Sequence, residues 1–477
     1  MQPLTVVKFG GSTWGKGENN IPIIMDRIRA IRKTDGIGPV VVVSTLPGIT
    51  NEAIGIGTRY AQNNFGAESD PLASINDRYL SFVTRYLGGE GSHKQSFYKE
   101  RGYVYSKQDG QSSMIIDTLN TIKRNRQFKG IDRARLLAYT GERLTDVAFS
   151  YVLRRHGMET YHYRLDTDWQ RDWPIVTDGR DSARFLFKES KERIGLVAKQ
   201  LEGGKIPVIG GFIGVTTDGI ETTYERGGSD RTAIDLGMLL KSESNYNVKV
   251  DFEKEVPVMS ADPRIVEKPK FVSHMSYNEL TLAGRCGMKI IDPVSIRDME
   301  REGIDVDSEI VDLYRPTFVT EITKKPAPVN GGSPVKVVTG KGKCAIAELD
   351  ISKRDAFRLY LKGIALYDDW VELSVDENKG RARFLFMDNE YVKDNEEILM
   401  GYDRNVSIDY DVGVTTLIGD DMGPAYGIAA NAFGALKDTK IRIKNFDGQG
   451  STSRILIVTG ESDVNETVRR VHGAKYN

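Results

Sequence analysis

The sequence predicts an α/β protein with a mostly parallel sheet, followed by two small α+β modules. Short runs rich in β-branched residues alternate with helical patterns along the first part of the chain, which is typical of βαβ units. A stretch rich in proline and glycine, Lys324 to Pro334, then interrupts every periodic pattern. Beyond it, two segments with the same order of predicted strands and helices follow one another, which indicates a pair of similar modules.

The chain opens with a βαβ unit. Residues 4–9 and 40–44 are short β-branched runs that end at a glycine or a turn signal, as buried parallel strands do. Between them, apolar residues recur at helical spacing from residue 21 to residue 31. The alternation returns with two strands and a helix, over residues 205–214, 246–252 and 229–241. Ligands of such sheets usually bind in the loops that follow the strands.

The remaining elements are predicted from helix signals and apolar patterns. Residues 64–129 are polar and helical in tendency, and we interpret them as a helical elaboration. A helix begins in the motif TGER and ends at Arg155, and a capping box of Ser276 and Glu279 opens another helix. The further predictions are helices over residues 293–301, 354–361 and 425–436, strands over 344–349, 371–375, 382–387, 414–418, 441–444 and 455–458, and a last strand and helix near 464–472.

The composition excludes several classes of protein. Among 477 residues, 66 basic side chains are balanced by 67 acidic ones, so we expect no nucleic-acid partner. No apolar run approaches the roughly 20 residues that span a bilayer, and no signal peptide opens the chain, so we expect no membrane partner and a cytoplasmic location. Cys286 and Cys344 lack the spacing of a zinc site, and the five histidines include no HxxxH pair. Both observations argue against a transition-metal centre.

Two lysines near the N-terminus compete for the role of a phosphate ligand. Gly10, Gly15 and Lys16 match a P-loop, but Gly17 stands where serine or threonine would hold magnesium. Lys8 lies at the carboxyl end of the first predicted strand. Its ammonium is placed to neutralise a phosphoryl group, and the glycine amides that follow approach phosphate oxygens without side-chain obstruction. From this stretch alone, a surface lysine before a plain turn remains an alternative.

Four further stretches carry candidate ligands. In ERGGSDRT, Ser229 and Asp230 lie at a predicted helix start, where they suit either an N-cap or a magnesium-phosphate site. Arg226 of the same stretch suits a bidentate contact with a carboxylate. Glu142 in TGER either complements a helix dipole or binds a substrate ammonium. The basic residues of the last two stretches, SADPR and GMK, are Arg264 and Lys289.

Taken together and in this order, these motifs resemble the aspartate kinases (aspartokinases) of the amino acid kinase family. KFGGST, VVVVSTLPGITN, TGER, GGFIG followed by RGGSD, ADPR and GMKIIDP stand in the family's order and approximate spacing. GVTTLIGDDMGPAYGIAANAFGAL, followed by KIRIKNFDGQGSTSRILIV, is similar to the second of the paired ACT modules that bind lysine or threonine in this family. The resemblance covers nearly the whole chain. It implies an amino acid kinase-like three-layer sandwich followed by two ACT (ferredoxin-like) modules.

The resemblance also implies an activity: transfer of the γ-phosphate of ATP to the side-chain carboxylate of L-aspartate, the first step towards lysine, threonine and methionine. Lys8 and Asp230 would be catalytic, with Mg²⁺ carried by ATP near Asp230 and no direct metal ligand from the protein. The implied substrate-binding residues are Ser44, Thr50, Glu142, Arg226 and Ser229. The implied nucleotide-binding residues are Gly10, Gly11, Ser12, Glu255, Arg264 and Lys289. The implied regulatory residues are Met422, Gln449, Gly450 and Ser451.

The chain departs from the family pattern in four places. Ser12 and Thr13 stand in reversed order, which keeps a hydroxyl at each position. Glu225 replaces a glycine, and Asp292 replaces a histidine. In VDFEKEVPVMSADPR, Glu255 replaces the family's aspartate and a glycine is missing. Because that segment lies beside the nucleotide in the family, we expect this departure to affect nucleotide affinity or preference.

The resemblance further implies domains, partners and alternatives. The implied parts are a catalytic domain over 1–323, a linker over 324–335, a first ACT-like module over 336–408 that residues 464–477 would complete, and a second over 409–463. ACT modules usually pair across subunits, so we expect a homodimer or larger homo-oligomer, with lysine or threonine as effector. One alternative is a related acyl-phosphate-forming kinase acting on glutamate or N-acetylglutamate, against which the ACT-like modules argue. Another is a catalytically weak amino-acid-sensing subunit, against which the retained charged residues argue.

Overall fold

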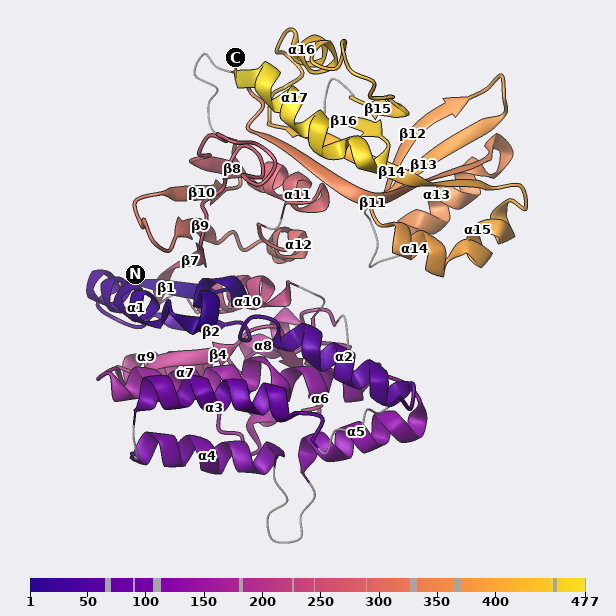
Figure 1. The fold of residues 1–477 in the computed structure, drawn as a ribbon. Coiled ribbons are helices and arrows are strands. Elements are labelled where there is room, and N and C mark those ends of the chain that lie inside the picture. The colour runs from indigo at the N-terminus through magenta and orange to yellow at the C-terminus, as the bar shows by residue number, and fades with distance from the viewer. Residues whose placement is uncertain are drawn as a thin grey trace. The chain divides into compact units, whose positions relative to one another are not determined.

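The computed structural model divides the chain into two compact units. Figure 1 colours the chain by residue number from indigo to yellow. The first comprises Met1–Pro257 and Val294–Glu321, and the second Val258–Pro293 and Ile322–Asn477. The structure describes residues 1–64, 70–88, 91–105, 113–179, 183–224, 227–243, 245–288, 290–326, 333–363, 370–448 and 453–476. In these ranges every helix is too short or too polar to cross a membrane. Packing thus groups residues 258–293 with the C-terminal modules.

The first unit is built on a mostly parallel sheet, which confirms the predicted fold class. Along the order β3-β4-β2-β1-β7-β9, each pair of neighbours is parallel. The strands of this unit are β1 (Gln2–Phe9), β2 (Val40–Val43), β3 (Thr160–Tyr161), β4 (Ile206–Gly210), β5 (Ile213–Val215), β6 (Glu221–Thr223), β7 (Tyr246–Lys254), β9 (Asp307–Asp312) and β10 (Val319–Thr323), the last of which continues into the second unit. All four valines of β2 are buried, as expected for a strand covered on both faces.

Helices cover both faces of this sheet and complete three layers. They are α1 (Ile21–Asp35), α2 (Ile49–Ala61), α3 (Ala73–Leu87), α4 (Ser92–Tyr105), α5 (Met114–Asn125), α6 (Gly130–Thr140), α7 (Glu142–Arg155), α8 (Phe187–Lys191), α9 (Gly195–Glu202), α10 (Gly228–Ser242) and α12 (Pro293–Glu302), with short 3-10 helices η1 (Gly11–Trp14), η2 (Lys16–Glu18) and η3 (Trp169–Arg171). Lys8 of β1 pairs in register with Phe252 of β7, so alternate residues of the two strands share a face. α10 lies on the Lys8 face, where Asp230 contacts that lysine, and α1 lies on the opposite face, where Arg27 contacts Asp251.

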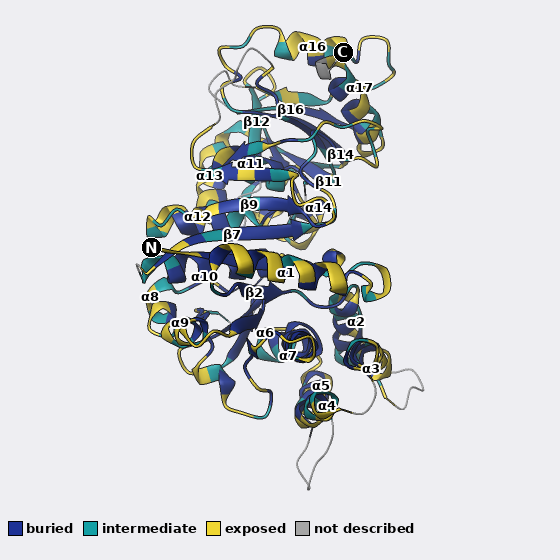
Figure 2. Ribbon diagram, turned by 90° about the vertical axis from the view of Figure 1, so that its left-hand side faces the viewer, coloured by how far each residue is buried: buried dark blue, intermediate teal, exposed yellow. Residues whose placement is uncertain are grey.

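Two sequence predictions for this unit are confirmed, and a third is corrected. α3, α4 and α5 form the predicted helical elaboration, and α1 shows the expected exposed face in Figure 2. The strand predicted over residues 205–214 instead stops at Gly210, and the chain turns before β5 pairs with β6 as a hairpin. Phe212 in this turn has a positive φ of 68°. A Cβ on Gly211 would lie 2.6 Å from the Cβ of Ser229, so the glycine allows the turn to approach the start of α10.

The second unit carries an antiparallel sheet in the order β12-β13-β11-β14-β16-β15. The strands of the second unit are β8 (His274–Ser276), β11 (Val337–Asp350), β12 (Trp370–Asp376), β13 (Arg381–Phe386), β14 (Ser407–Ile418), β15 (Asn445–Asp447) and β16 (Arg454–Thr459), and all of them except β8 belong to this sheet. Its helices are α11 (Tyr277–Arg285), α13 (Arg354–Gly363), α14 (Asn389–Asp394), α15 (Glu396–Tyr402), α16 (Ile428–Gly434) and α17 (Val464–Tyr476), with η4 (Ile351–Lys353) and η5 (Glu461–Asp463). The predicted repeat is confirmed: each module supplies a strand, a helix, two strands and further helix, and the two share one sheet through β11 and β14.

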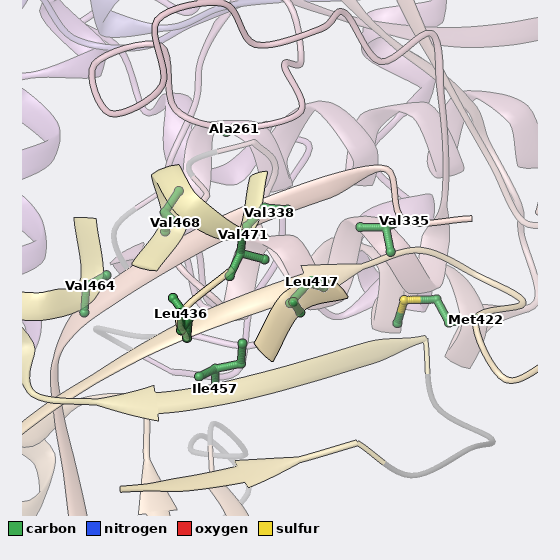
Figure 3. Packing of buried hydrophobic residues seen from close by; sticks show 11 residues of the cluster. Ala261, Val335, Val338, Leu417, Met422, Leu436, Ile457, Val464, Val468 and Val471 are labelled. Atoms are coloured by element: carbon green, nitrogen blue, oxygen red, sulfur yellow. The ribbon is translucent and has the colours of Figure 1, made fainter. Parts of the chain in front are cut away.

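The core of the second module lies under α17. In Figure 3, Val464, Val468 and Val471 of this helix lie in one cluster with Val338 of β11 and Leu417 of β14. The helix predicted near residues 464–472 is therefore confirmed, and it packs on strands of both modules. The strand predicted beside it is wrong, because the described residues before α17 form the short helix η5.

Three further predictions in the second unit can be compared with the structure. The capping box is confirmed, since the side chains of Ser276 and Glu279 each accept a hydrogen bond from the other's backbone N–H. α16 is shorter than the predicted 425–436. The alternation over residues 441–444 predicts a strand, but β15 begins only at Asn445. Ile441 is partly buried against the core cluster under α17, but Ile443 is exposed, so the alternating pattern of the segment is not matched by burial of both residues.

Candidate active site

An acidic side chain and two lysines meet where β1 and β7 end. Lys8 Nζ lies 2.5 Å from Asp230 Oδ1, and Lys254 Nζ lies 3.4 Å from Asp230 Oδ2. Burial alone would raise the pKa of Asp230, but the charges of Lys254 and Lys8 hold that pKa below its ordinary value. Asp230 is therefore an ionised carboxylate between two ammonium groups. The sequence singled out Lys8 and Asp230, but it gave no role to Lys254.

The start of α10 brings Asp230 to this place. The sequence left open that Ser229 or Asp230 caps the helix, but the N-cap is Gly227, with a φ of 93°. Ser229 and Asp230 therefore lie in the first helical turn, where their side chains are not used for capping. A Cβ on Gly228 would lie 2.4 Å from the Cβ of Tyr224, so the chain needs a glycine to enter the helix this closely.

Two glycines after β1 leave open space beside the Lys8 ammonium. A Cβ on Gly10 would lie 3.2 Å from Lys8 Nζ, and a Cβ on Gly11 would lie 3.3 Å from the carbonyl oxygen of Thr45. Side chains at these positions would fill the surface next to the ammonium. Backbone amides without side chains, next to a fixed positive charge, are suited to phosphate oxygens. The residues present thus fit a nucleotide phosphate.

The loop after β1 is tied to the loop after β2. Trp14 Nε1 donates a hydrogen bond to the carbonyl oxygen of Ser44 at 3.2 Å, and Thr13 donates to the Gly10 carbonyl through both its N–H and its hydroxyl. Ser44 is half-buried at the end of β2, next to this loop. Ser12 and Lys16 are exposed. The P-loop interpretation of Lys16 therefore has no structural support, since Lys8 is the lysine that lies against Asp230.

Glu142 is a buried acid at the first position of α7. Its Oε1 accepts a hydrogen bond from the Thr45 N–H at 3.4 Å, and the residue is only 4% exposed. Burial raises the pKa of Glu142 to about 7, although backbone hydrogen bonds and the charge of Lys8 partly offset this effect. The cost of burying this carboxylate in its ionised form is only partly offset by its neighbours. It is therefore suited to receive a cationic group of a ligand.

The arginine that follows Glu142 is structural. Arg143 is fully buried, and its Nη1 lies 2.5 Å from Asp146 Oδ2. The same carboxylate oxygen accepts a hydrogen bond from the Gly210 N–H at 2.9 Å, which joins α7 to the end of β4. The guanidinium also lies 4.5 Å from the ring centroid of Trp169. This pair fixes the start of α7 and hence the place of Glu142.

Several other predicted site residues have partners or surroundings that the structure describes. Thr50 is half-buried in the first turn of α2. Glu255 follows β7, and its Oε1 accepts a hydrogen bond from the Tyr314 hydroxyl at 3.4 Å. Arg264 belongs to the second unit, where its side chain is 88% exposed and forms an ion pair with Asp262 at 2.6 Å. The candidates Arg226, Lys289, Gln449, Gly450 and Ser451, together with Glu225, lie outside the described residues.

Met422, predicted to be regulatory, lines a cavity of about 320 Å³ in the second unit. Asp420 lies in the same wall and accepts hydrogen bonds from Asn278 Nδ2 at 2.8 Å and Ser453 Oγ at 2.7 Å. A third donor is the Ser276 hydroxyl. Burial would raise the pKa of Asp420, but these hydrogen bonds keep it below its ordinary value. The cavity thus presents an ionised carboxylate beside an apolar side chain.

The described residues contain no group of three or more His, Cys, Asp and Glu side chains that could hold a metal ion. The position of Mg²⁺ carried by ATP near Asp230 therefore stays a prediction.

Comparisons with known proteins identify the family of this chain and the solved structures that share its fold. An aspartokinase of Bacillus sp. (strain MGA3) is 26% identical over 351 residues, which cover 71% of this chain and 81% of that protein. The fold is similar to E. coli aspartokinase III in complex with aspartate and ADP, with a TM-score of 0.77, 17% identity and coverage of 99% of this chain and 100% of the other. The same enzyme in complex with lysine and aspartate gives a TM-score of 0.67 at 18% identity, with 99% and 100% covered. Residues 3–307 match the amino acid kinase family. The chain belongs to that family.

Proposed function

We propose that this protein is an aspartate kinase, which transfers the γ-phosphate of ATP to the side-chain carboxylate of L-aspartate and gives 4-phospho-L-aspartate and ADP. The observation that carries the proposal is the buried ion pair of Lys8 and Asp230 beside the open backbone of Gly10 and Gly11. The aspartokinases among the relatives support it, and so does the fold shared with an aspartokinase whose structure holds aspartate and ADP.

The reaction needs charge neutralisation more than proton transfer. An oxygen of the aspartate side chain attacks the γ-phosphorus, and the bond from that phosphorus to the bridging oxygen breaks, so that ADP leaves with the electron pair. The nucleophile is already an anion, and no general base is required. Lys8 neutralises charge on the transferred group, and Asp230 keeps the ammonium directed at the end of β1. Mg²⁺ bound with ATP would neutralise further phosphate charge.

The substrate would be held by charges that match a zwitterion. Glu142 is assigned to the α-ammonium of aspartate and must be ionised to bind it, which the ammonium itself favours by lowering the pKa of the acid. Arg226 is assigned to the α-carboxylate. The hydroxyl groups of Ser44, Thr50 and Ser229 are assigned to the remaining polar contacts. The nucleotide is assigned to Gly10, Gly11, Ser12, Glu255, Arg264 and Lys289.

Regulation and assembly belong to the same proposal. Residues 1–323 would form the catalytic domain and 324–335 the linker. The ACT-like modules over 336–408 (with 464–477) and 409–463 would bind lysine or threonine near Gln449, Gly450 and Ser451, with Met422 as a further regulatory residue. The lysine complex of E. coli aspartokinase III supports an amino-acid effector. Pairing of the modules between subunits would give a homo-oligomer. These assignments and the cytoplasmic location remain predictions.

The test is chemical trapping of the acyl phosphate. Incubation with MgATP, L-aspartate and hydroxylamine should yield aspartyl hydroxamate, and Lys8→Ala should abolish it. Product with glutamate in place of aspartate would contradict the proposal and favour a related acyl-phosphate-forming kinase. Absence of product with either amino acid, with amino-acid binding retained, would favour a sensing subunit.

A further inference from the structure

Lys254 occupies the last position of β7, next to β1 in the sheet. The parallel register pairs Lys8 with Phe252 and Phe9 with Glu253, so Lys254 lies level with Gly10. Residues two apart on a strand point to the same face. Lys254 is two residues beyond Phe252 and therefore shares the face of Lys8, the face that α10 covers. Because Gly10 has no side chain, nothing on β1 stands between the two lysines at this level.

The two ammonium groups share one carboxylate. Lys8 contacts Asp230 Oδ1, and Lys254 contacts Asp230 Oδ2. Within the described part of the chain, Asp230 is the only ion-pair partner of either lysine. One negative charge therefore faces two positive charges, and the cluster keeps a net charge of about +1 in a buried place. A structural ion pair would need only one of these lysines.

Lys254 is also the more accessible and the more weakly held of the two. Its side chain is 20% exposed against 7% for Lys8, and its 3.4 Å contact with Asp230 is long for a hydrogen bond. An ammonium has three donors, and the described part of the chain uses one of those on Lys254, which leaves two for a ligand there. Burial lowers the pKa of Lys254, but the neighbouring carboxylate of Asp230 partly offsets this effect.

We propose that Lys254 is a second phosphate-binding residue, whose ammonium contacts an oxygen of the terminal phosphoryl group of ATP opposite Lys8. The inference rests on the proposed function and deepens it. Asp230 then positions two cations, and the transferred group lies between them. The segment VDFEKEVPV, which departs from the family pattern, would thus supply a positive charge on the nucleotide side.

Equilibrium binding of nucleotides to the full-length protein tests this. Lys254→Met should weaken MgATP binding by about 10- to 100-fold, the range expected for a lost hydrogen bond between charged groups. The same variant should weaken MgADP binding less and adenosine binding not at all. Lys254→Arg should retain most of the MgATP affinity. Lys241→Met is a matched control, because Lys241 lies at the far end of α10, where its ammonium donates a hydrogen bond to the Asp305 carbonyl.

An unchanged dissociation constant for MgATP in Lys254→Met would overturn the inference, and so would equal losses for MgATP and adenosine, which indicate a structural role. Lysine acetylation of the wild-type protein gives a test that needs no variant. MgATP should protect Lys254 from the reagent and adenosine should not. Equal labelling of Lys254 in the presence of MgATP and of adenosine would also overturn the inference.

If the protein binds MgATP as expected but yields no aspartyl hydroxamate, the proposed function fails and the role of Lys254 does not.

Discussion

The substitution Glu142→Gln should stabilise the protein at high pH, because Glu142 is a buried acid whose burial is only partly offset by backbone hydrogen bonds and the charge of Lys8. Its pKa is raised from 4.5 to about 7 by burial. Below pH 4.5 the carboxyl group is protonated in both the folded and the unfolded chain. Between pH 4.5 and 7 the unfolded chain ionises first, so the free energy of unfolding falls as pH rises. Above pH 7 the carboxyl group is ionised in both states, and the free energy of unfolding has lost the whole contribution of this group.

The size of this effect can be worked out from the pKa. A change from 4.5 to about 7 corresponds to about 3 kcal/mol, at about 1.4 kcal/mol for each pH unit. Glutamine has nearly the same shape and does not titrate. The difference in unfolding free energy between Glu142→Gln and the wild type should therefore grow by about 3 kcal/mol from pH 4.5 to pH 8, in favour of the variant.

Urea unfolding at several pH values measures this difference. Tryptophan fluorescence reports mainly on the first unit, which contains Trp14, Trp169 and Trp173, whereas Trp370 lies in the second. Glu300→Gln, an exposed change in α12, is the matched control and should give no such trend. A difference between Glu142→Gln and wild type that does not depend on pH would refute the reasoning. The variant should also lose the rise of kcat/KM for aspartate with pH near 7 that an ionising Glu142 gives the wild type.

Three further predictions concern other contacts. Asp230→Asn should lower kcat for hydroxamate formation by about 100-fold or more, because a neutral amide no longer positions the ammonium groups; a loss below tenfold would contradict this. Gly211→Ala places a methyl group 2.6 Å from the Cβ of Ser229, so the KM for aspartate should rise and thermal unfolding should show a loss of about 1–3 kcal/mol. Lys336→Met removes the cation 2.7 Å from the buried carboxylate of Glu279 and should destabilise the second unit by about 3 kcal/mol, measured by urea unfolding, without changing MgATP affinity.

The sequence predicts most of the fold because the decisive patterns are local. The runs over residues 4–9 and 40–44 are apolar on both faces, and such strands can only be buried in a sheet covered on two sides. One error lies where burial fails to follow the pattern. Residues 441–444 alternate as a strand would, yet Ile443 is exposed and the strand β15 begins only afterwards. Alternating apolar residues therefore predict a strand only where the apolar side chains can be buried against one face of a sheet.

The site was less accessible to prediction because it depends on contacts between distant parts of the chain. Lys8 could be identified, since it stands at the end of a recognisable strand before two glycines. Asp146 could also have been found, because it lies three residues after Arg143 on one helix and forms an i, i+3 ion pair. Lys254 could not, since its role depends on the register between β1 and β7, which no local pattern records.

Neighbouring side chains at the end of β7 point to opposite faces of the sheet and make different contacts there. Glu253 points to the α1 face, where Arg27 Nε lies 2.5 Å from its Oε1 and partly offsets the burial that raises its pKa to about 7. Lys254, the next residue, points to the α10 face and contacts Asp230. Glu255 lies beyond the strand and contacts Tyr314 instead. Among the described residues, Lys254 thus contacts Asp230, whereas the Glu255 carboxylate, which the sequence singled out, contacts Tyr314. Nucleotide affinity should respond more to loss of the Lys254 charge than to loss of the Glu255 charge, because only the former adds to the positive charge around Asp230.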